Sequence, residues 1–204
     1  MVTKRDGYHH GNLRAALTEA AVAAAREGGE RAVRLSRVAA ATGVSPAAAY
    51  WHFPAGRDDL LAAVGEFGRR ELAEHLLMRV VAVEPSPEAA TVAVRRFRAS
   101  GQAYVEHVLE QPGLFQVALR RACGRSSHAD PLAVLEGCVD ELVATGTVSP
   151  QERDGVVAAA WSTVHGLAML LTDGPLRRLS DSCRRSVIDR TLDIAQAGLC
   201  RPER

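Results

Sequence analysis

The segment from Leu35 to Arg57 constrains the fold of this chain more than any other part of the sequence. It predicts two short helices joined by a tight turn. We expect Ser36 to cap the first helix, because its hydroxyl can accept a backbone N–H. Gly43 suits the end of that helix, where a left-handed residue is needed. The turn between the two helices is therefore predicted at Gly43.

The second helix of the pair is short and sharply bounded. Ser45 suits its N-cap, and Pro46 suits its first position, where a missing N–H costs nothing. Pro54 stops it after barely two turns, so it needs tertiary support. Such a pair is typical of a helix-turn-helix, whose second helix lies in the DNA major groove. An ordinary helical hairpin in a larger bundle fits the spacing about as well.

The residues of the pair divide into an inner and an outer set. The inner set can form a small apolar core and comprises Leu35, Val38, Ala39, Val44, Ala48 and Phe53. The outer set offers hydroxyl, imidazole and guanidinium groups that can contact phosphates, and comprises Ser36, Arg37, Ser45, Ala47, Tyr50, Trp51, His52 and Arg57.

The N-terminal third also resembles the DNA-binding domain of the TetR family of transcriptional regulators. The similarity is carried by an Ala-rich first helix ending in Glu27-Gly28-Gly29, then Val38-Ala39, Gly43-Val44-Ser45, Tyr50-Trp51-His52-Phe53-Pro54 and Leu60-Leu61. The family often has a Lys where Arg57 stands, and here an extra Gly56 precedes it. A second segment, Ala160–Ala168, resembles the Trp-His-Gly class of TetR C-terminal domains, as does the start at Tyr8–Leu13.

Bulk properties limit the class of protein further. The formal net charge is +1, so any contact with DNA must come from a local patch. Lys4 and Arg5 lie on an N-terminal arm that can reach the phosphate backbone or the minor groove.

The four cysteines show no zinc spacing, and we expect them to be buried small hydrophobes, with a redox sensor as the minor alternative. No apolar run is long enough to predict a membrane span, so we expect a cytoplasmic protein.

Helix punctuation predicts an all-α protein without strands. The first helix covers 10–27, a long fourth helix covers 57–82, and further helices follow to the C-terminus. Ser86 is predicted to cap one helix, and Ser149 to form a capping box with Glu152. We expect a helix-turn-helix domain over 1–60 and a helical effector-binding and dimerisation domain over 61–204.

The last two helices are close in sequence and can pair with their copies as a four-helix interface. The resemblance implies this homodimer, and the need to contact two DNA half-sites supports it physically. We expect Val164 and Leu192 to lie in the interface. Burial of both helices within one subunit is the alternative.

A small-molecule cavity is the second predicted site. Trp161 and His165 are four residues apart and share a helix face. They either pack as a core pair or line a cavity beside Gly166. The other predicted lining residues are Phe97, Tyr104, His107, Phe115 and Leu119.

The sequence thus predicts a DNA-binding regulator, most simply a repressor that a small-molecule effector releases from a palindromic double-stranded operator. Ser45, Tyr50, His52 and Arg57 are expected on phosphates, and Ala47, Ala48 and Trp51 on base edges. Enzyme motifs are absent, and neither a metal site nor a cofactor is predicted. A helical enzyme and a helical interaction protein without DNA binding are the alternatives.

Overall fold

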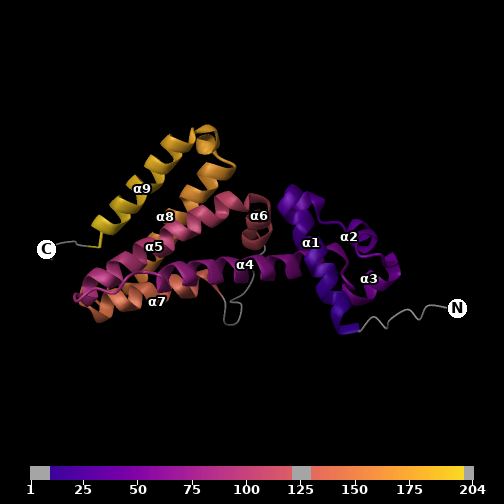
Figure 1. Ribbon diagram of the computed structural model, residues 1–204, viewed down its shortest axis with the longest axis horizontal. Coiled ribbons are helices and arrows are strands. Elements are labelled where there is room, and N and C mark those ends of the chain that lie inside the picture. The colour runs from indigo at the N-terminus through magenta and orange to yellow at the C-terminus, as the bar shows by residue number, and fades with distance from the viewer. Residues whose placement is uncertain (1–9, 121–129, 200–204) are drawn as a thin grey trace. The chain divides into compact units, whose positions relative to one another are not determined.

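The computed structural model describes residues 10–120 and 130–199, and all regular structure within those ranges is helical (Figure 1). The chain forms two compact units. The first contains residues 1–68 and 112–124, and the second contains residues 69–111 and 125–204. The all-α expectation is confirmed.

The first unit is built from α1 (His10–Ala32), α2 (Leu35–Ala41), α3 (Pro46–His52), the start of α4 (Arg57–Val81) and α6 (Pro112–Arg120). Backbone angles leave the helical region at Gly28 and Gly29, so the regular part of α1 ends where the glycine pair predicts. A single apolar core joins these helices; its largest fully buried members include Leu17, Leu60, Leu61, Phe53 and Leu114.

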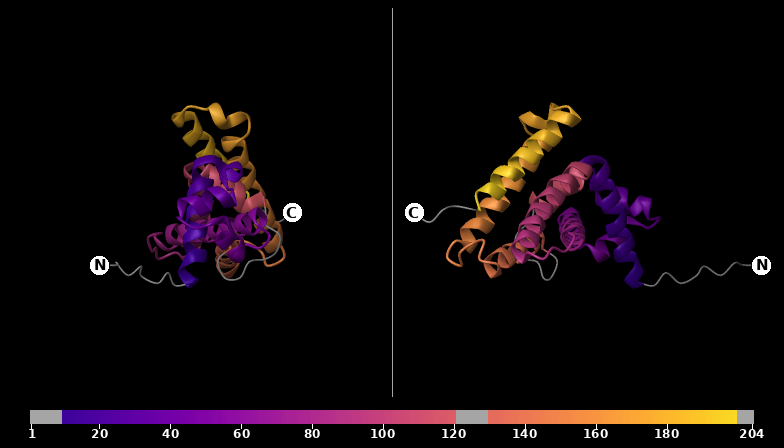
Figure 2. Two further views of the ribbon diagram at one scale, coloured as in Figure 1. Left: turned by 90° about the vertical axis from the view of Figure 1, so that its right-hand side faces the viewer. Right: turned by 60° about the vertical axis from the view of Figure 1, so that its left-hand side comes forward.

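The second unit is built around α5 (Ala89–Glu110), which contacts α7 (Pro131–Ala144), α8 (Arg153–Thr172) and α9 (Asp181–Ala197). The remainder of α4 completes this unit, and a short 3₁₀ turn, η1 (Pro175–Arg178), joins α8 to α9. α9 runs back beside α8, as both views of Figure 2 show. The apolar core of the second unit includes Phe97, Leu135, Val139 and Leu142.

Side-chain caps mark the starts of α3, α7 and α9. The Asp130 side chain accepts the Leu132 N–H at 3.0 Å and starts α7 with Pro131 at its first position. Ser180 accepts the Cys183 N–H at 3.3 Å and starts α9. Both satisfy backbone donors that the first turn of a helix leaves without partners.

Three predicted caps are wrong. α2 starts two residues earlier than a Ser36 cap would place it, because buried Leu35 belongs to its first turn and the Arg34 carbonyl accepts the first helical N–H. Ser36 therefore lies inside the helix, with its side chain exposed. α5 starts at Ala89 behind Glu88, not at Ser86. The Ser149 hydroxyl donates to the Glu152 carboxylate at 3.1 Å, so the two side chains bond to each other and form no capping box with the backbone. α8 starts after Glu152.

Candidate nucleic-acid interface and effector cavity

The turn between α2 and α3 has the geometry that the sequence predicts. Gly43 adopts φ +70°, and the Val44 N–H returns to the Ala39 carbonyl at 3.0 Å. The Ser45 hydroxyl accepts the Ala48 N–H at 3.2 Å, and Pro46 is the first residue of α3. These local bonds fix the direction in which the second helix leaves the turn.

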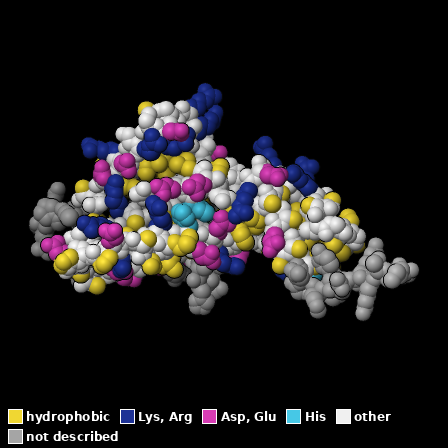
Figure 3. Space-filling view, in the orientation of Figure 1, with side chains coloured by type: hydrophobic (Ala, Val, Ile, Leu, Met, Phe, Trp, Pro, Cys, Tyr) yellow, Lys and Arg dark blue, Asp and Glu magenta, His cyan; other side chains and the backbone are white. Residues whose placement is uncertain are grey.

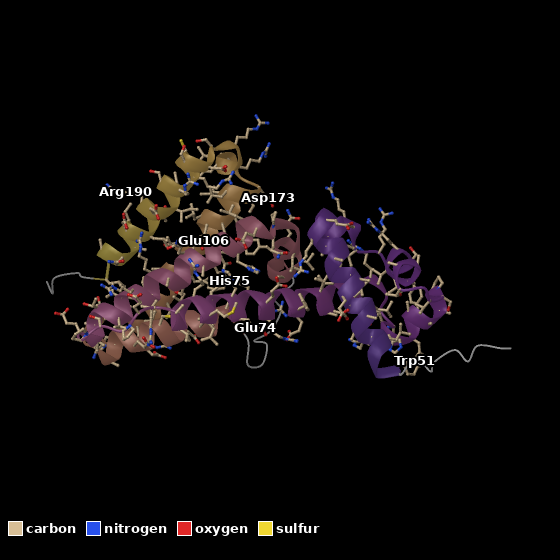
Figure 4. All side chains as sticks on the ribbon, viewed as in Figure 1. Trp51, Glu74, His75, Glu106, Asp173 and Arg190 are labelled. Carbon is tan, nitrogen blue, oxygen red and sulfur yellow. The ribbon has the colours of Figure 1, made fainter. Side chains whose placement is uncertain are left out.

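The surface of α3 is largely apolar and aromatic. Trp51, which Figure 4 labels, is 74% exposed. Tyr50 is 54% exposed, and Ala47 is also on the surface. Ala48 and His52 are half-buried, and Ala49 is buried in the core. The Trp51 ring meets the His52 ring edge-on, with centroids 4.9 Å apart. The outer face of α3 therefore presents Ala47, Tyr50 and Trp51 together.

Arg14 of α1 holds the end of α3, a role that sequence reasoning missed. Its guanidinium lies 4.5 Å from the centre of the Phe53 ring and donates to the His52 carbonyl. A cation at a helix C-terminus satisfies a carbonyl and opposes the helix dipole. The partners are 38 residues apart in sequence, so no local signal could have revealed them.

Tyr50 packs over the extra glycine that precedes α4. Gly56 adopts φ +65°, and a Cβ built there would lie 3.1 Å from Tyr50 Cε1. The glycine thus serves both the left-handed backbone and the close approach of the ring.

We expect Gly56→Ala to destabilise the protein by about 1–2 kcal/mol, because it combines a left-handed alanine with a displaced Tyr50 ring. DNA affinity should fall as well, since Tyr50 moves on the outer face. Thermal unfolding and binding isotherms measure the two effects. Gly137→Ala in α7 is the control, because a Cβ there meets no atom within 4 Å and the residue lies outside both proposed binding surfaces. Wild-type stability in Gly56→Ala would contradict the assigned contact.

Two of the predicted phosphate-binding arginines already have partners within the unit. Arg57 donates from Nε to the Val33 carbonyl at 2.9 Å and from a terminal nitrogen to the Glu30 carbonyl at 2.6 Å. Arg37 pairs with Glu27 at 2.9 Å, and both side chains are well exposed. An exposed pair of this kind is worth little in water, so Arg37 can exchange Glu27 for a phosphate at small cost.

A basic hollow of about 450 Å³ lies where α1 ends and α2 begins. It is lined by Arg31, Ala32, Arg34, Ser36 and Arg37. Dark blue side chains gather over this end of α1 and over α2 in Figure 3. Sequence reasoning named Ser36 and Arg37 but not Arg31 or Arg34, whose clustering follows only from the fold. The predicted arm residues Lys4 and Arg5 lie outside the described residues.

The second unit encloses an apolar cavity lined by residues of α4, α5, α7, α8 and α9. The cavity measures only about 20 Å³, close to the room needed by one water molecule. Phe97, Tyr104 and Trp161 line it, as predicted, together with Leu135 and Leu192. The predicted cavity is therefore present but nearly filled by side chains.

Tyr104 and His165 form the main polar contact beside the cavity. The Tyr104 hydroxyl lies 3.0 Å from His165 Nδ1, and Trp161 meets the Tyr104 ring edge-on at 5.3 Å between centroids. Burial lowers the pKa of His165 and raises the pKa of Tyr104, so both groups are neutral near pH 7. A neutral imidazole nitrogen can accept a hydrogen bond from the Tyr104 hydroxyl.

The remaining predicted lining residues lie elsewhere. His165 stands behind Tyr104, and buried His107 packs against His75 with ring centroids 5.1 Å apart, so neither lines the cavity. Phe115 is buried in the first unit because α6 belongs there. The side chain of Leu119 lies outside the described part of the chain.

The lowered pKa of His165 predicts an acid-dependent loss of stability. As the pH falls below about 6.5, the unfolded chain takes up a proton at this residue before the folded protein does, so acid favours unfolding. We expect His165→Gln to lose less stability than wild type between about pH 7.5 and about pH 5. Denaturant titrations of both proteins test this, and equal losses would contradict it. The other histidines are common to both proteins and cancel in the difference.

A more open hollow of about 460 Å³ lies on the surface of α8 and α9. Gly155, Ala159 and Thr163 line it from α8, and Ile194, which is 64% exposed, lines it from α9. The residues we expected in the interface are elsewhere. Val164 and Leu192 are buried against Gly101 of α5, because that glycine leaves room for both side chains.

The outer side of α8 is unusually apolar for an exposed surface. Contrary to the expectation that no apolar run is long enough to span a membrane, this helix passes by length and composition alone. Only a third of its most apolar window is buried. Met169 and Leu170 are 36% and 42% exposed. This part of α8 therefore leaves apolar side chains open to solvent.

The cysteines and acidic residues form no metal site within the described residues. Cys138 is buried, and burial raises the pKa of its thiol to about 11, which leaves it unreactive. Cys183 is exposed, because it lies on the outer side of the first turn of α9, so the expectation that all four cysteines are buried is wrong for this residue. Cys123 and Cys200 are not described.

Comparison with known families agrees with this arrangement. Residues 17–64 match the family profile described as bacterial regulatory proteins of the tetR family. Residues 97–194 match the profile described as a tetracyclin repressor-like C-terminal domain. The chain belongs to the TetR family. It is therefore a transcriptional regulator with a helix-turn-helix DNA-binding domain and a C-terminal ligand-binding domain. The Trp-His-Gly subclass stays a prediction.

Solved structures show the same fold over nearly the whole chain. A protein of unknown function from Rhodococcus sp. RHA1 is 29% identical with a TM-score of 0.77, covering 97% of this chain and 100% of that one. A bacterial regulatory protein of the tetR family from Rhodococcus RHA1 is 16% identical with a TM-score of 0.59, covering 93% and 98%. SmeT, solved as a complex with triclosan, is 16% identical with a TM-score of 0.53, covering 95% and 96%. No match was found among curated proteins.

Proposed function

We propose that this TetR-family regulator is a cytoplasmic, homodimeric repressor that a small-molecule effector releases from a palindromic operator. The observation that carries the DNA-binding role is the outer face of α3. Tyr50 and Trp51 are large aromatic side chains that the unit leaves exposed on a short, firmly capped helix. A helix of seven residues has little other reason to present them to solvent.

Phosphate contacts would come from the rim around α3. Ser45, Tyr50 and His52 lie on α3 or at its cap, and Ser36 and Arg37 lie on α2. The basic hollow adds Arg31 and Arg34 as positions for backbone phosphates. Arg57 acts mainly through the α1–α2 turn that it holds. Lys4 and Arg5, which lie outside the described residues, would add two further positive charges for phosphates. Among the base-edge candidates, half-buried Ala48 is the least accessible.

The dimer would form over the outer faces of α8 and α9. The hollow there is lined by small residues and Ile194, so a second copy can bring its own helices close. A twofold axis between two copies matches the symmetry of a palindrome, which offers one half-site to each α3.

The effector would bind where the second unit holds its small cavity. A ligand of ordinary size needs at least about 300 Å³. The present cavity is far smaller, so binding requires Phe97, Trp161 and their neighbours to move apart. Effector affinity then depends on a conformational change, which is the basis for coupling it to DNA release. The lining favours a mainly apolar ligand with one polar group near Tyr104.

Selection of bound DNA from a random pool by the purified protein tests the DNA-binding role. We expect enrichment of a palindrome whose half-site centres are about one helical turn apart. A scrambled version of the winning sequence at fixed salt is the control. Recovery of no sequence preference would contradict a sequence-specific regulator.

Effector coupling makes a separate prediction. We expect an inducing compound to bind less tightly when operator is present, by the same factor by which it weakens operator binding. Fluorescence titration of Trp161 in the Trp51→Phe background measures both affinities. If every compound that quenches Trp161 binds equally well with and without operator, this cavity is not the inducing site.

A further inference from the structure

The first turn of α3 lacks the side chains that read bases by hydrogen bonding. Its first four residues are Pro46, Ala47, Ala48 and Ala49, and none carries a polar side chain. The Ser45 hydroxyl already accepts the Ala48 N–H as the helix cap. In a helix-turn-helix, the N-terminal residues of the second helix are the ones that contact base edges. The residues best placed to read sequence are therefore apolar.

Trp51 continues this apolar surface by one helical turn. It is four residues after Ala47, so the two side chains lie on one face of α3. It is also the most exposed large hydrophobic residue of the described chain, at 74%. The His52 ring supports it edge-on at 4.9 Å between centroids. Its ring is thus held at the surface, beside the small side chain of Ala47.

Only one group on the major-groove edges of DNA is apolar, the C5-methyl of thymine. Guanine, cytosine and adenine present donors and acceptors that need partners when water is removed. An alanine, a proline and an indole face cover a methyl group well, whereas they leave the polar edges unpaired. We propose that α3 selects its operator through thymine methyl groups contacted by Ala47 and Trp51, with Pro46 at the edge of the contact. This selection rests on the DNA-binding role proposed above.

The small side chains have a second consequence for this contact. Alanine and proline allow the helix backbone to approach the floor of the groove closely, which lets the indole lie against the bases. Positioning along the duplex then comes from the surrounding phosphate contacts, including Arg37, and carries no sequence information. Methyl contacts and phosphate contacts can therefore be separated experimentally.

The test replaces thymine by deoxyuridine, which removes the methyl group and keeps every hydrogen-bonding group. It uses the full-length protein and the operator selected from the random pool, at one fixed salt concentration. Removing one buried methyl should weaken binding about fourfold, and removing the symmetry-related pair about 15-fold. The same replacement outside the half-sites should have no effect.

Variants assign the effect to α3. In Trp51→Ala the loss of affinity on replacing thymine by deoxyuridine should shrink, because the larger of the two apolar partners of the methyl is gone and only Ala47 remains. Arg37→Ala is the matched control: it should weaken both operators by the same factor and preserve their ratio. Both residues are exposed, so thermal unfolding should match wild type.

The outcomes separate this inference from the proposed function. An operator whose half-sites contain no thymine, or one that tolerates deoxyuridine at every half-site position, would overturn methyl recognition while leaving sequence-specific binding intact. Failure to enrich any operator would overturn the DNA-binding role itself, and this inference with it.

Discussion

Gly113→Ala should destabilise the first unit by about 3 kcal/mol and lower the unfolding midpoint by about 6–12 °C. A Cβ built on Gly113 would lie 2.3 Å from the carbonyl oxygen of Ala25 and 3.2 Å from the Arg26 carbonyl oxygen. Both obstacles are backbone atoms of α1, so no side chain can rotate away. α6 can accept a methyl group there only by moving off α1.

The matched control is Gly137→Ala in α7. A Cβ at Gly137 meets nothing within 4 Å, and the residue lies in the interior of a helix. Alanine is the better helix former, so this variant should gain up to about 1 kcal/mol. Thermal unfolding followed by circular dichroism measures both variants. Equal midpoints for the two would show that α6 does not approach α1 as closely as the structure has it.

Residues with a local effect on the backbone made most helix ends and turns predictable from the sequence. Gly43, Ser45 and Pro46 act within a few residues of themselves, so the α2–α3 turn could be predicted from spacing alone. The glycine pair at Gly28 and Gly29 likewise marks the end of regular α1. Ser36 was misassigned because tertiary burial of Leu35 outweighs the local preference for a serine cap.

Long-range contacts set the details of the site and could not be predicted. Arg14 reaches the end of α3 across 38 residues, and Arg57 reaches carbonyls 24 and 27 residues away. Arginine is common on helix surfaces, and its sequence position does not say which carbonyl or phosphate it meets. The sequence predicts Arg57 on phosphates, whereas in the structure its guanidinium binds two backbone carbonyls of its own unit.

Helical periodicity identifies an apolar stripe but not the surface that covers it. The stripe through Val164 and Leu192 was expected to face a second subunit, and it faces α5 instead. Only the fold shows that Gly101 of α5 makes room for it. The residues left for a partner are the ones outside that stripe, including Ala159 and Ile194. Their exposure could be judged only once the core was known.

The dimer interface proposed over α8 and α9 predicts that Ile194→Asp converts the dimer to a monomer. Ile194 is 64% exposed in one subunit and lines the hollow on α8 and α9, so a second copy would bury it. A carboxylate there would be desolvated without a partner, and association would be lost. The subunit itself should keep its fold, because the position is exposed within it. Sedimentation at micromolar concentration measures the change.

Loss of the dimer should also remove most of the operator affinity. Two linked α3 helices bind two half-sites together, which typically raises affinity about 10²–10⁴-fold over one. Ile194→Asp should therefore weaken binding to the palindrome by about that factor and leave binding to an isolated half-site nearly unchanged. Ala133→Asp, at an exposed position of α7, adds the same charge outside the hollow and should retain both the dimer and the affinity. A wild-type monomer, or an Ile194→Asp dimer with full operator affinity, would place the interface elsewhere. The effect on DNA thus follows from geometry alone, since Ile194 belongs to the second unit and lies outside the DNA-binding domain.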